Sequence, residues 1–492
     1  MDINILNILM IQLTEDSKKS IQFVKEHFYP YSISKLDGFL DLSQKIISTY
    51  TEIDKNLDLD VPICLKKDNT QLDEKGNIYW ILSQLSNNYP QLLNIDKQII
   101  DKYIENTNCM NQEDRREWLD KAGRMLVENI CNIIKNNQLP NKLSIILDRV
   151  CTKEYLAIYE TSFMSQQIRD EIEKDFHCIS IYKTRYELLT MEIVVISSSN
   201  KSNYSLVKQL IKHLITIIYS SKNISTQTKM KMKVFMSDAK KQLPQKDKPK
   251  ILGINEVNTG STYRGDCTSV VLWRKEELIK VATHEWNHCL VNDCNFPEEI
   301  NDKLRNMFAI PNDTEIKVYE SYVELWAIIV NLSIISSIKK EYSLEKILNI
   351  ECSYCFFQIA KILHYFGFTK WEDFYQKKDS KDYKQESSIL SYYIIKTTLL
   401  YNIDEFIEWC YLSNGRHFNG GESRILPIKF INNTHNTNSY YQLIKKSLDK
   451  VGVKENINYY LTNVFLTNNQ IKESDYIINT LRMSCFELGD SN

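Results

Sequence analysis

The segment Val281-Ala-Thr-His284-Glu285-Trp-Asn-His288-Cys-Leu290 contains the pattern His-Glu-x-x-His within an apolar stretch. Residues four apart lie on the same face of a helix, so the imidazoles of His284 and His288 can reach one metal ion. Glu285 lies one position round the helix, where its carboxylate can serve as a general base toward water. The chain has only 8 histidines among 492 residues, which makes a chance match uncommon. The segment therefore predicts a helix that carries a metal site.

The sequence around this helix predicts a sheet. Short runs rich in β-branched residues begin after residue 141 and are typical of strands. A turn-rich stretch at 258–266 precedes the last strand and the metal-site helix, which we expect at about 275–290. The strands are predicted at 143–148, 178–182, 188–196, 232–236 and 268–273, with a further helix at 205–219.

A hydrolytic zinc site needs a third protein ligand and an open position for water. The apolar helix predicted over 319–338 offers two carboxylates, Glu320 and Glu324. Glu324 lies in the middle of the apolar run 322–330, where a carboxylate is costly to bury unless it is paired or bound to a cation. Glu320 is closer to the edge of that run and can stay solvated. The residues therefore favour Glu324 and leave Glu320 as an alternative ligand.

The motif His284-Glu285-x-x-His288, followed downstream by Glu324-x-x-Ala327, resembles the gluzincin branch of zinc metallopeptidases. The resemblance covers residues 255–331 and implies that His284, His288 and Glu324 bind Zn²⁺ while Glu285 is the general base. It also implies an edge strand beside the cleft, which would place residues 259–271 along a peptide substrate. The interval from His288 to Glu324 is longer than in compact gluzincins, which keeps Glu320 open as the ligand.

A second, looser similarity concerns the amino-acid composition of the chain. Its abundance of Lys, Asn and Ile, and segments such as 385–393, look like uncharacterised metallopeptidases of large DNA viruses. A viral origin would place the protein in the host cytoplasm or the virion.

Peptide hydrolysis also requires a donor to the tetrahedral oxyanion, commonly a Tyr, His or Arg that faces the zinc. His364, Tyr392 and Tyr393 are candidates on later helices. The chain contains 29 tyrosines, so packing is the alternative role for each tyrosine.

Composition and charge describe an ordinary globular protein, with 43% hydrophobic and 25% charged residues. The formal net charge of −2 gives no electrostatic case for binding nucleic acid or a membrane. Eight lysines between 229 and 250 fit a solvated strand and linker. The apolar stretch 322–338 is too short and too interrupted to predict a membrane span.

The cysteines indicate a reducing compartment. Twelve cysteines without regular spacing are typical of reduced thiols in an intracellular protein. Cys352-x-x-Cys355 has no partner pair nearby and lies in an aromatic-rich helical stretch, which favours buried thiols over zinc or redox chemistry.

These observations predict an α+β protein in three regions. Residues 1–140 form a helical N-terminal region, 141–338 a zincin-like catalytic domain with a mixed sheet and two active-site helices, and 339–492 a helical region that closes the cleft. The predicted function is zinc-dependent hydrolysis of peptide bonds in a peptide or protein substrate. The alternative is a catalytically inactive protein that keeps the zincin fold for a structural or interaction role.

Overall fold

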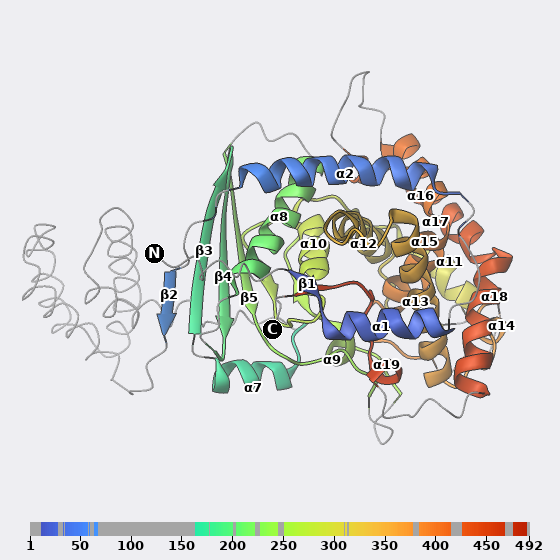
Figure 1. Cartoon of the computed structure of the whole chain (residues 1–492). Coiled ribbons are helices and arrows are strands. Elements are labelled where there is room, and N and C mark those ends of the chain that lie inside the picture. Colours follow the sequence, from blue (N-terminus) through green and yellow to red (C-terminus); the bar gives the residue numbers. More distant parts are fainter. Residues whose placement is uncertain are drawn as a thin grey trace, which may run out of the picture.

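The computed structural model describes residues 11–489 with several gaps. These gaps are 28–32, 34, 58, 60–62, 67–162, 177, 200–202, 222–226, 245–249, 309, 312–313, 377–382, 415–425 and 468–475. The described chain is a mixed α+β structure, as the sequence predicts, with the sheet on one side and a large helical body on the other (Figure 1).

The main sheet has six strands in the order β2-β3-β4-β5-β7-β6. Its first three strands are antiparallel to one another, β4, β5 and β7 are parallel, and β6 pairs antiparallel with β7 at the edge. Of the parallel strands, β4 and β7 are rich in Val and Ile because both faces of the sheet are covered, whereas β5 carries three lysines. The bounds are β2 Ile63–Lys66, β3 Cys178–Tyr186, β4 Leu189–Ser197, β5 Thr228–Phe235, β6 Gly260–Ser261 and β7 Val270–Leu272.

Helices cover both faces of this sheet. α7 (Gln166–Asp175) packs Ile168 and Ile172 against one face, in a small apolar cluster that includes Trp273. The other face is covered by α8 (Tyr204–Ser221) and α10 (Leu278–Cys289), and it merges with the main hydrophobic core. α10 thus lies between the sheet and the helical body (Figure 1).

α12 (Tyr319–Ile338) runs through the centre of the helical body and packs directly against α10. Almost every residue of α12 is buried, which explains why its sequence is apolar nearly all round. It is the one helix, among the residues that the structure describes, that is long and apolar enough to cross a membrane, and 89% of its apolar window is buried inside the protein. Core helices commonly have this composition.

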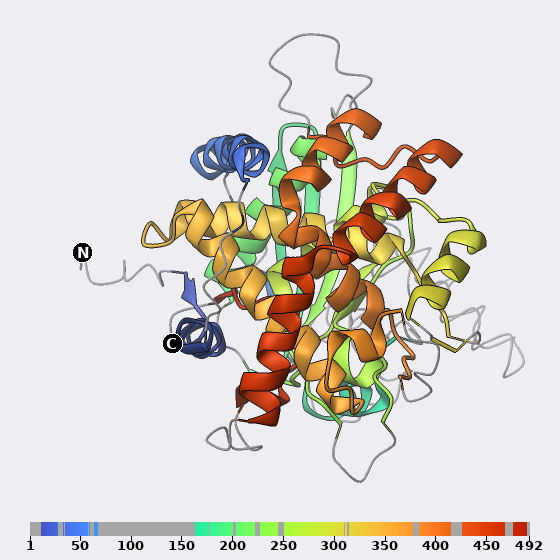
Figure 2. The same ribbon diagram turned by 90° about the vertical axis from the view of Figure 1, so that its right-hand side faces the viewer.

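The N-terminal and C-terminal helices pack round α12. α2 contacts α8 and α12, and α1 contacts α13. Turned by 90°, the C-terminal helices, in orange and red, stand in front of the green strands (Figure 2). The remaining elements are β1 Gln12–Leu13, α1 Glu15–His27, α2 Asp37–Asn56, α9 Ile254–Val257, α11 Glu298–Phe308, α13 Leu344–Tyr365, α14 Trp371–Phe374, η3 Leu390–Ile395, α15 Lys396–Tyr401, α16 Ile403–Asn414, α17 Thr434–Leu448, α18 Val451–Tyr460, η4 Leu461–Leu466, α19 Tyr476–Asn479 and β8 Leu488–Gly489.

Most predicted elements near the motif are confirmed. β3, β4, β5, β7, α8, α10 and α12 lie where the sequence predicts them, within a few residues at their ends. The strand predicted at 143–148 and the helices predicted between 67 and 140 lie outside the described residues. One hydrophobic core extends from Leu13 to Leu488, so residues from all three predicted regions share it. The boundaries of those regions stay a prediction.

Two predictions about individual side chains are wrong. Cys267 and Cys289 form a disulfide, whereas the sequence predicts reduced thiols throughout. Lys241 is fully buried and pairs with Glu277, although it belongs to the lysine run expected to be solvated. Both differences arise because tertiary contacts bring together partners that are distant in sequence. Cys352 and Cys355 are free and buried, as predicted.

Candidate metal centre

Three ligand atoms converge between α10 and α12. His284 and His288, one turn apart on α10, direct their Nε2 atoms at each other across 3.1 Å. Glu320, in the first turn of α12, places Oε2 3.1 Å from Nε2 of His284 and 3.4 Å from Nε2 of His288. The three residues form a group that can hold a metal ion.

The outer edges of both imidazoles are occupied by carboxylates. Glu324 Oε2 lies 2.9 Å from Nδ1 of His284, and Asp293 Oδ2 lies 2.8 Å from Nδ1 of His288. Because a carboxylate accepts, each Nδ1 is the donor, and each neutral ring then directs an Nε2 lone pair at the other. Two lone pairs and a carboxylate oxygen facing one point require a cation or extra protons between them. This donor set fits zinc.

Glu324, the ligand that the sequence favours, takes a different position. Its Oε2 lies behind His284, and its Oε1 accepts a hydrogen bond from Lys280 Nζ at 2.5 Å. Glu320 and Glu324 are one turn apart and hold opposite edges of the same imidazole. The structure therefore brings Glu320, the alternative, to the two Nε2 atoms, and leaves Glu324 on the Nδ1 edge of His284.

Glu285 lines the cleft beside the two histidines. The cleft has a volume of about 710 Å³ and is bordered by the edge strand β6. Gly260 of β6 lies close to Leu272 and Glu285, since a Cβ at Gly260 would be 2.5 Å from Leu272 Cδ2 and 3.0 Å from both Cγ and Oε1 of Glu285. A side chain at this position would press on Leu272 and on the Glu285 carboxylate. The contact places Glu285 between the metal-binding group and the edge of the sheet.

Two tyrosines flank the histidines from the cleft side. The ring of Tyr392, in the π-helical turn η3, is 5.8 Å from the ring of His284, and the ring of Tyr319 is 5.9 Å from that of His288. Tyr393 instead donates its hydroxyl to the Leu481 carbonyl inside the core. His364 is exposed and stacks on Phe465 outside the cleft. Of the three predicted oxyanion donors, only Tyr392 is near the metal-binding group.

The carboxylates and imidazoles of the centre shift one another's pKa. Burial alone lowers the pKa of His284 and His288, but the neighbouring carboxylates outweigh it and raise both pKa values. For Glu320 burial acts in the opposite direction, yet the two histidines hold its pKa well below the usual range. Burial raises the pKa of Glu285 above its ordinary value. A carboxyl with a raised pKa is a better proton acceptor, as a general base requires.

A cluster of buried charges supports the start of α10. Glu277, the residue before the helix, has a positive φ of 59° and pairs with Lys241 at 2.6 Å. The other oxygen of Glu277 accepts hydrogen bonds from the backbone N–H groups of Met483 and Ser484. Lys280, 3.6 Å from Glu277, connects this cluster to Glu324. The C-terminal segment therefore fixes the helix that carries both histidines.

Sequence reasoning missed Asp293, Tyr319 and Lys280. Asp293 lies in a polar segment five residues after His288, and no spacing rule marks it. Lys280 was detectable in principle, since a lysine four residues before His284 occupies the histidine face of an apolar helix. A buried lysine on that face predicts a carboxylate partner.

Comparison of the chain with family models, with curated proteins and with solved structures finds no match. The resemblance to gluzincins therefore rests on the sequence motif and stays a prediction.

Proposed function

We propose that this chain is a zinc-dependent metallopeptidase of the zincin type, in which His284, His288 and Glu320 hold the zinc. The observation that carries the proposal is the convergence of two Nε2 atoms and one carboxylate oxygen within 3.1–3.4 Å in a cleft. Both rings are oriented from behind by carboxylates, as metal-binding histidines usually are. When bound, zinc supplies Lewis acidity that polarises a carbonyl and makes water acidic enough to attack at neutral pH.

The residues round the centre have distinct roles in this proposal. Glu285 accepts the proton of the attacking water and later passes it to the leaving amine, which its raised pKa favours. Tyr392 donates its hydroxyl to the developing oxyanion. Glu324 and Asp293 hold the two imidazoles in one tautomer, so that neither ring has to reorganise during the reaction.

The shape of the cleft favours an extended peptide as the substrate. β6 is the last strand of the described sheet and lies beside Glu285. A peptide in extended conformation can add to such an edge through backbone hydrogen bonds. This arrangement would place a scissile carbonyl next to the metal-binding group.

The experiment compares the wild type with Glu285→Gln for zinc content and for cleavage of a peptide library followed by mass spectrometry. Glutamine keeps the shape of the side chain and removes the base, so we expect zinc in both proteins and cleavage in the wild type only. Glu299→Gln, an exposed carboxylate on α11, is the matched control and should cleave like the wild type.

Two results would contradict the proposal. A wild type that retains no zinc after metal loading rules out the metal centre. Full zinc occupancy without cleavage in any variant favours the alternative, a catalytically inactive protein that keeps the scaffold for a structural or interaction role.

A further inference from the structure

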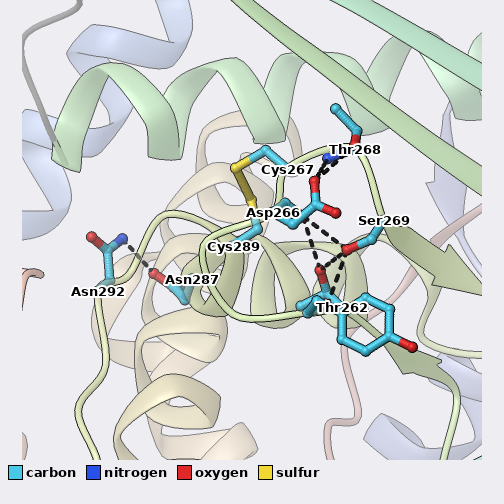
Figure 3. Close-up of a disulfide and its surroundings, with 9 residues drawn as sticks. Thr262, Asp266, Cys267, Thr268, Ser269, Asn287, Cys289 and Asn292 are labelled. Atoms are coloured by element: carbon cyan, nitrogen blue, oxygen red, sulfur yellow. Dashed lines mark hydrogen bonds between the residues drawn. A yellow bond between two sulfur atoms is a disulfide. The ribbon is translucent and has the colours of Figure 1, made fainter.

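The loop of residues 262–269, between β6 and β7, is attached to the C-terminal end of α10 at three points. Gly265 N–H donates to the His288 carbonyl at 3.3 Å. Arg264 pairs with Asp293 through Nε to Oδ1 at 2.9 Å and through Nη2 to the backbone carbonyl at 2.7 Å. Cys267 forms a disulfide with Cys289, the residue after His288 (Figure 3). This loop therefore contacts the metal-binding helix where the second histidine lies.

The Arg264 contact determines where Asp293 lies. Asp293 follows the end of α10, so helical hydrogen bonds do not fix its position. Its carboxylate is buried, with one oxygen on Arg264 Nε and the other on His288 Nδ1. Each oxygen thus has a charged or donating partner, and rotating the carboxylate would break both contacts. The orientation of the His288 ring follows from the position of Arg264.

The 262–269 loop is itself well ordered by local hydrogen bonds. Asp266 Oδ1 accepts from the backbone N–H and the hydroxyl of Thr268, and Ser269 Oγ donates to the Asp266 carbonyl (Figure 3). Gly265 has a φ of +82°, which favours glycine at the turn. This turn presents Arg264 to Asp293, and the disulfide is its covalent tie to α10 beside the Gly265–His288 hydrogen bond.

His284 is oriented by different means. Its partner Glu324 lies in the interior of α12 and is held by Lys280, with no disulfide involved. Opening the disulfide would therefore release the support of His288 and leave that of His284 in place. The orientation of His288 therefore depends on the disulfide, and the orientation of His284 does not.

We propose that Asp293 is a positioning residue for His288 and that the Cys267–Cys289 disulfide, acting through the 262–269 loop, makes zinc retention dependent on the redox state of the protein. This inference rests on the proposed zinc site. A dithiol reductant would supply two electrons and two protons, so that Cys267 and Cys289 become thiols and the dithiol becomes a disulfide. Once this covalent tie is cut, only hydrogen bonds and the Arg264–Asp293 ion pair connect the loop to the end of α10, so Arg264 fixes Asp293 less firmly and His288 binds zinc less tightly.

The test measures zinc affinity by chelator competition in the oxidised and reduced protein. A phosphine reductant is used because, unlike a thiol, it does not compete for zinc. It becomes a phosphine oxide by taking an oxygen atom from water, and the disulfide gains the two hydrogens. We expect reduction to weaken zinc binding on the order of 10-fold, the range in which partners behind a metal-binding histidine act.

Three variants make the test specific. Cys267→Ser/Cys289→Ser should bind zinc as weakly as the reduced wild type and should not respond to the reductant. Asp293→Asn should lower zinc affinity in both redox states. Arg264→Lys should keep more of the wild-type zinc affinity than Arg264→Gln does. Cys294→Ser, a free buried cysteine next to Asp293, is the control and should respond to reduction as the wild type does.

The outcomes separate this inference from the proposed function. Equal zinc affinity in the oxidised and reduced wild type overturns the inference while leaving the zinc site intact. A lower unfolding midpoint after reduction with unchanged zinc affinity also overturns it, because the disulfide would then be structural only. No zinc binding by the oxidised wild type overturns the metal centre itself.

Discussion

Replacing Glu320 and Glu324 one at a time with glutamine should separate a metal ligand from a residue that orients one. Glu320 Oε2 lies 3.1 Å from Nε2 of His284, whereas Glu324 Oε2 lies 2.9 Å from Nδ1 of the same ring. Glu324→Gln should therefore weaken zinc binding by about 10- to 100-fold, which corresponds to about 1.4 to 2.7 kcal/mol. Glu320→Gln removes a charged ligand, and the protein should no longer retain zinc.

The difference can be measured as zinc-dependent stability. A ligand that binds only the folded state stabilises it by about 4.1 kcal/mol when its free concentration is 1,000 times Kd. At the same free zinc, a 100-fold weaker Glu324→Gln would keep about 1.4 kcal/mol of that stabilisation. Glu320→Gln would keep almost none of the stabilisation by zinc. Urea unfolding of each variant in buffered zinc and in chelator gives these differences directly, with Glu299→Gln as the exposed control.

The zinc-free proteins provide an independent check. In Glu324→Gln, Lys280 stays buried, loses the carboxylate at 2.5 Å and keeps Glu277 at 3.6 Å. Removing one member of a buried ion pair costs about 3 kcal/mol, so the zinc-free variant should unfold at lower urea. The assignment is refuted if Glu320→Gln retains zinc and Glu324→Gln loses it, which would return the ligand to Glu324.

Three further predictions concern the base, the oxyanion donor and the C-terminal segment. Gly260→Ala should lower peptide cleavage by about 10-fold at unchanged zinc content, because the new Cβ would lie 3.0 Å from Cγ and Oε1 of Glu285 and would press the carboxylate out of place; an unchanged rate would argue against Glu285 as the base. Tyr392→Phe should lower kcat by about 10²- to 10³-fold and leave KM nearly unchanged, as steady-state kinetics would show; a rise in KM alone would indicate a binding role instead. Burial raises the pKa of Glu487 from 4.5 to about 7, so the folded state binds this proton more tightly than the unfolded chain does and stability falls as pH rises through that interval. The difference corresponds to about 3 kcal/mol, and urea unfolding at pH 5 and pH 8 should show this loss in the wild type and not in Glu487→Gln.

The scaffold of the metal centre could be predicted from local patterns. β4 is a run of β-branched and apolar residues, β5 alternates Lys with Met before it ends in Val234 and Phe235, and α10 carries two histidines at helical spacing within an apolar segment. These signals depend only on neighbours in sequence, and the structure confirms the elements. The catalytic role of Glu285 and the identity of the metal stay predictions.

The choice between Glu320 and Glu324 could not be made from the sequence. α12 is buried nearly all round, so the distribution of apolar residues does not show which side faces α10. Burial also fails to discriminate, because both carboxylates are buried and both have cationic or imidazole neighbours. The rotation of α12 against α10 decides which carboxylate faces the Nε2 atoms, and that rotation depends on contacts between residues distant in sequence.

Long-range partners explain the remaining differences. The sequence gives no sign that Arg264 meets Asp293, that Cys267 meets Cys289, or that Lys241 meets a carboxylate 36 residues away. Each pair joins a loop to one end of α10, so none follows from helical or strand periodicity.

The buried charged residues round α10 are better explained by the way they position neighbouring elements than by a contribution to the stability of the fold. Apolar residues in place of a buried ion pair often leave stability unchanged or increase it, so Lys241, Glu277 and Lys280 are not needed to hold the core together. Their contacts are directional, however. Glu277 binds the C-terminal segment at the start of α10, and Lys280 holds Glu324 against His284. We infer that this cluster fixes the rotation of α10 and α12, because a change in that rotation would part the Nε2 atoms from Glu320.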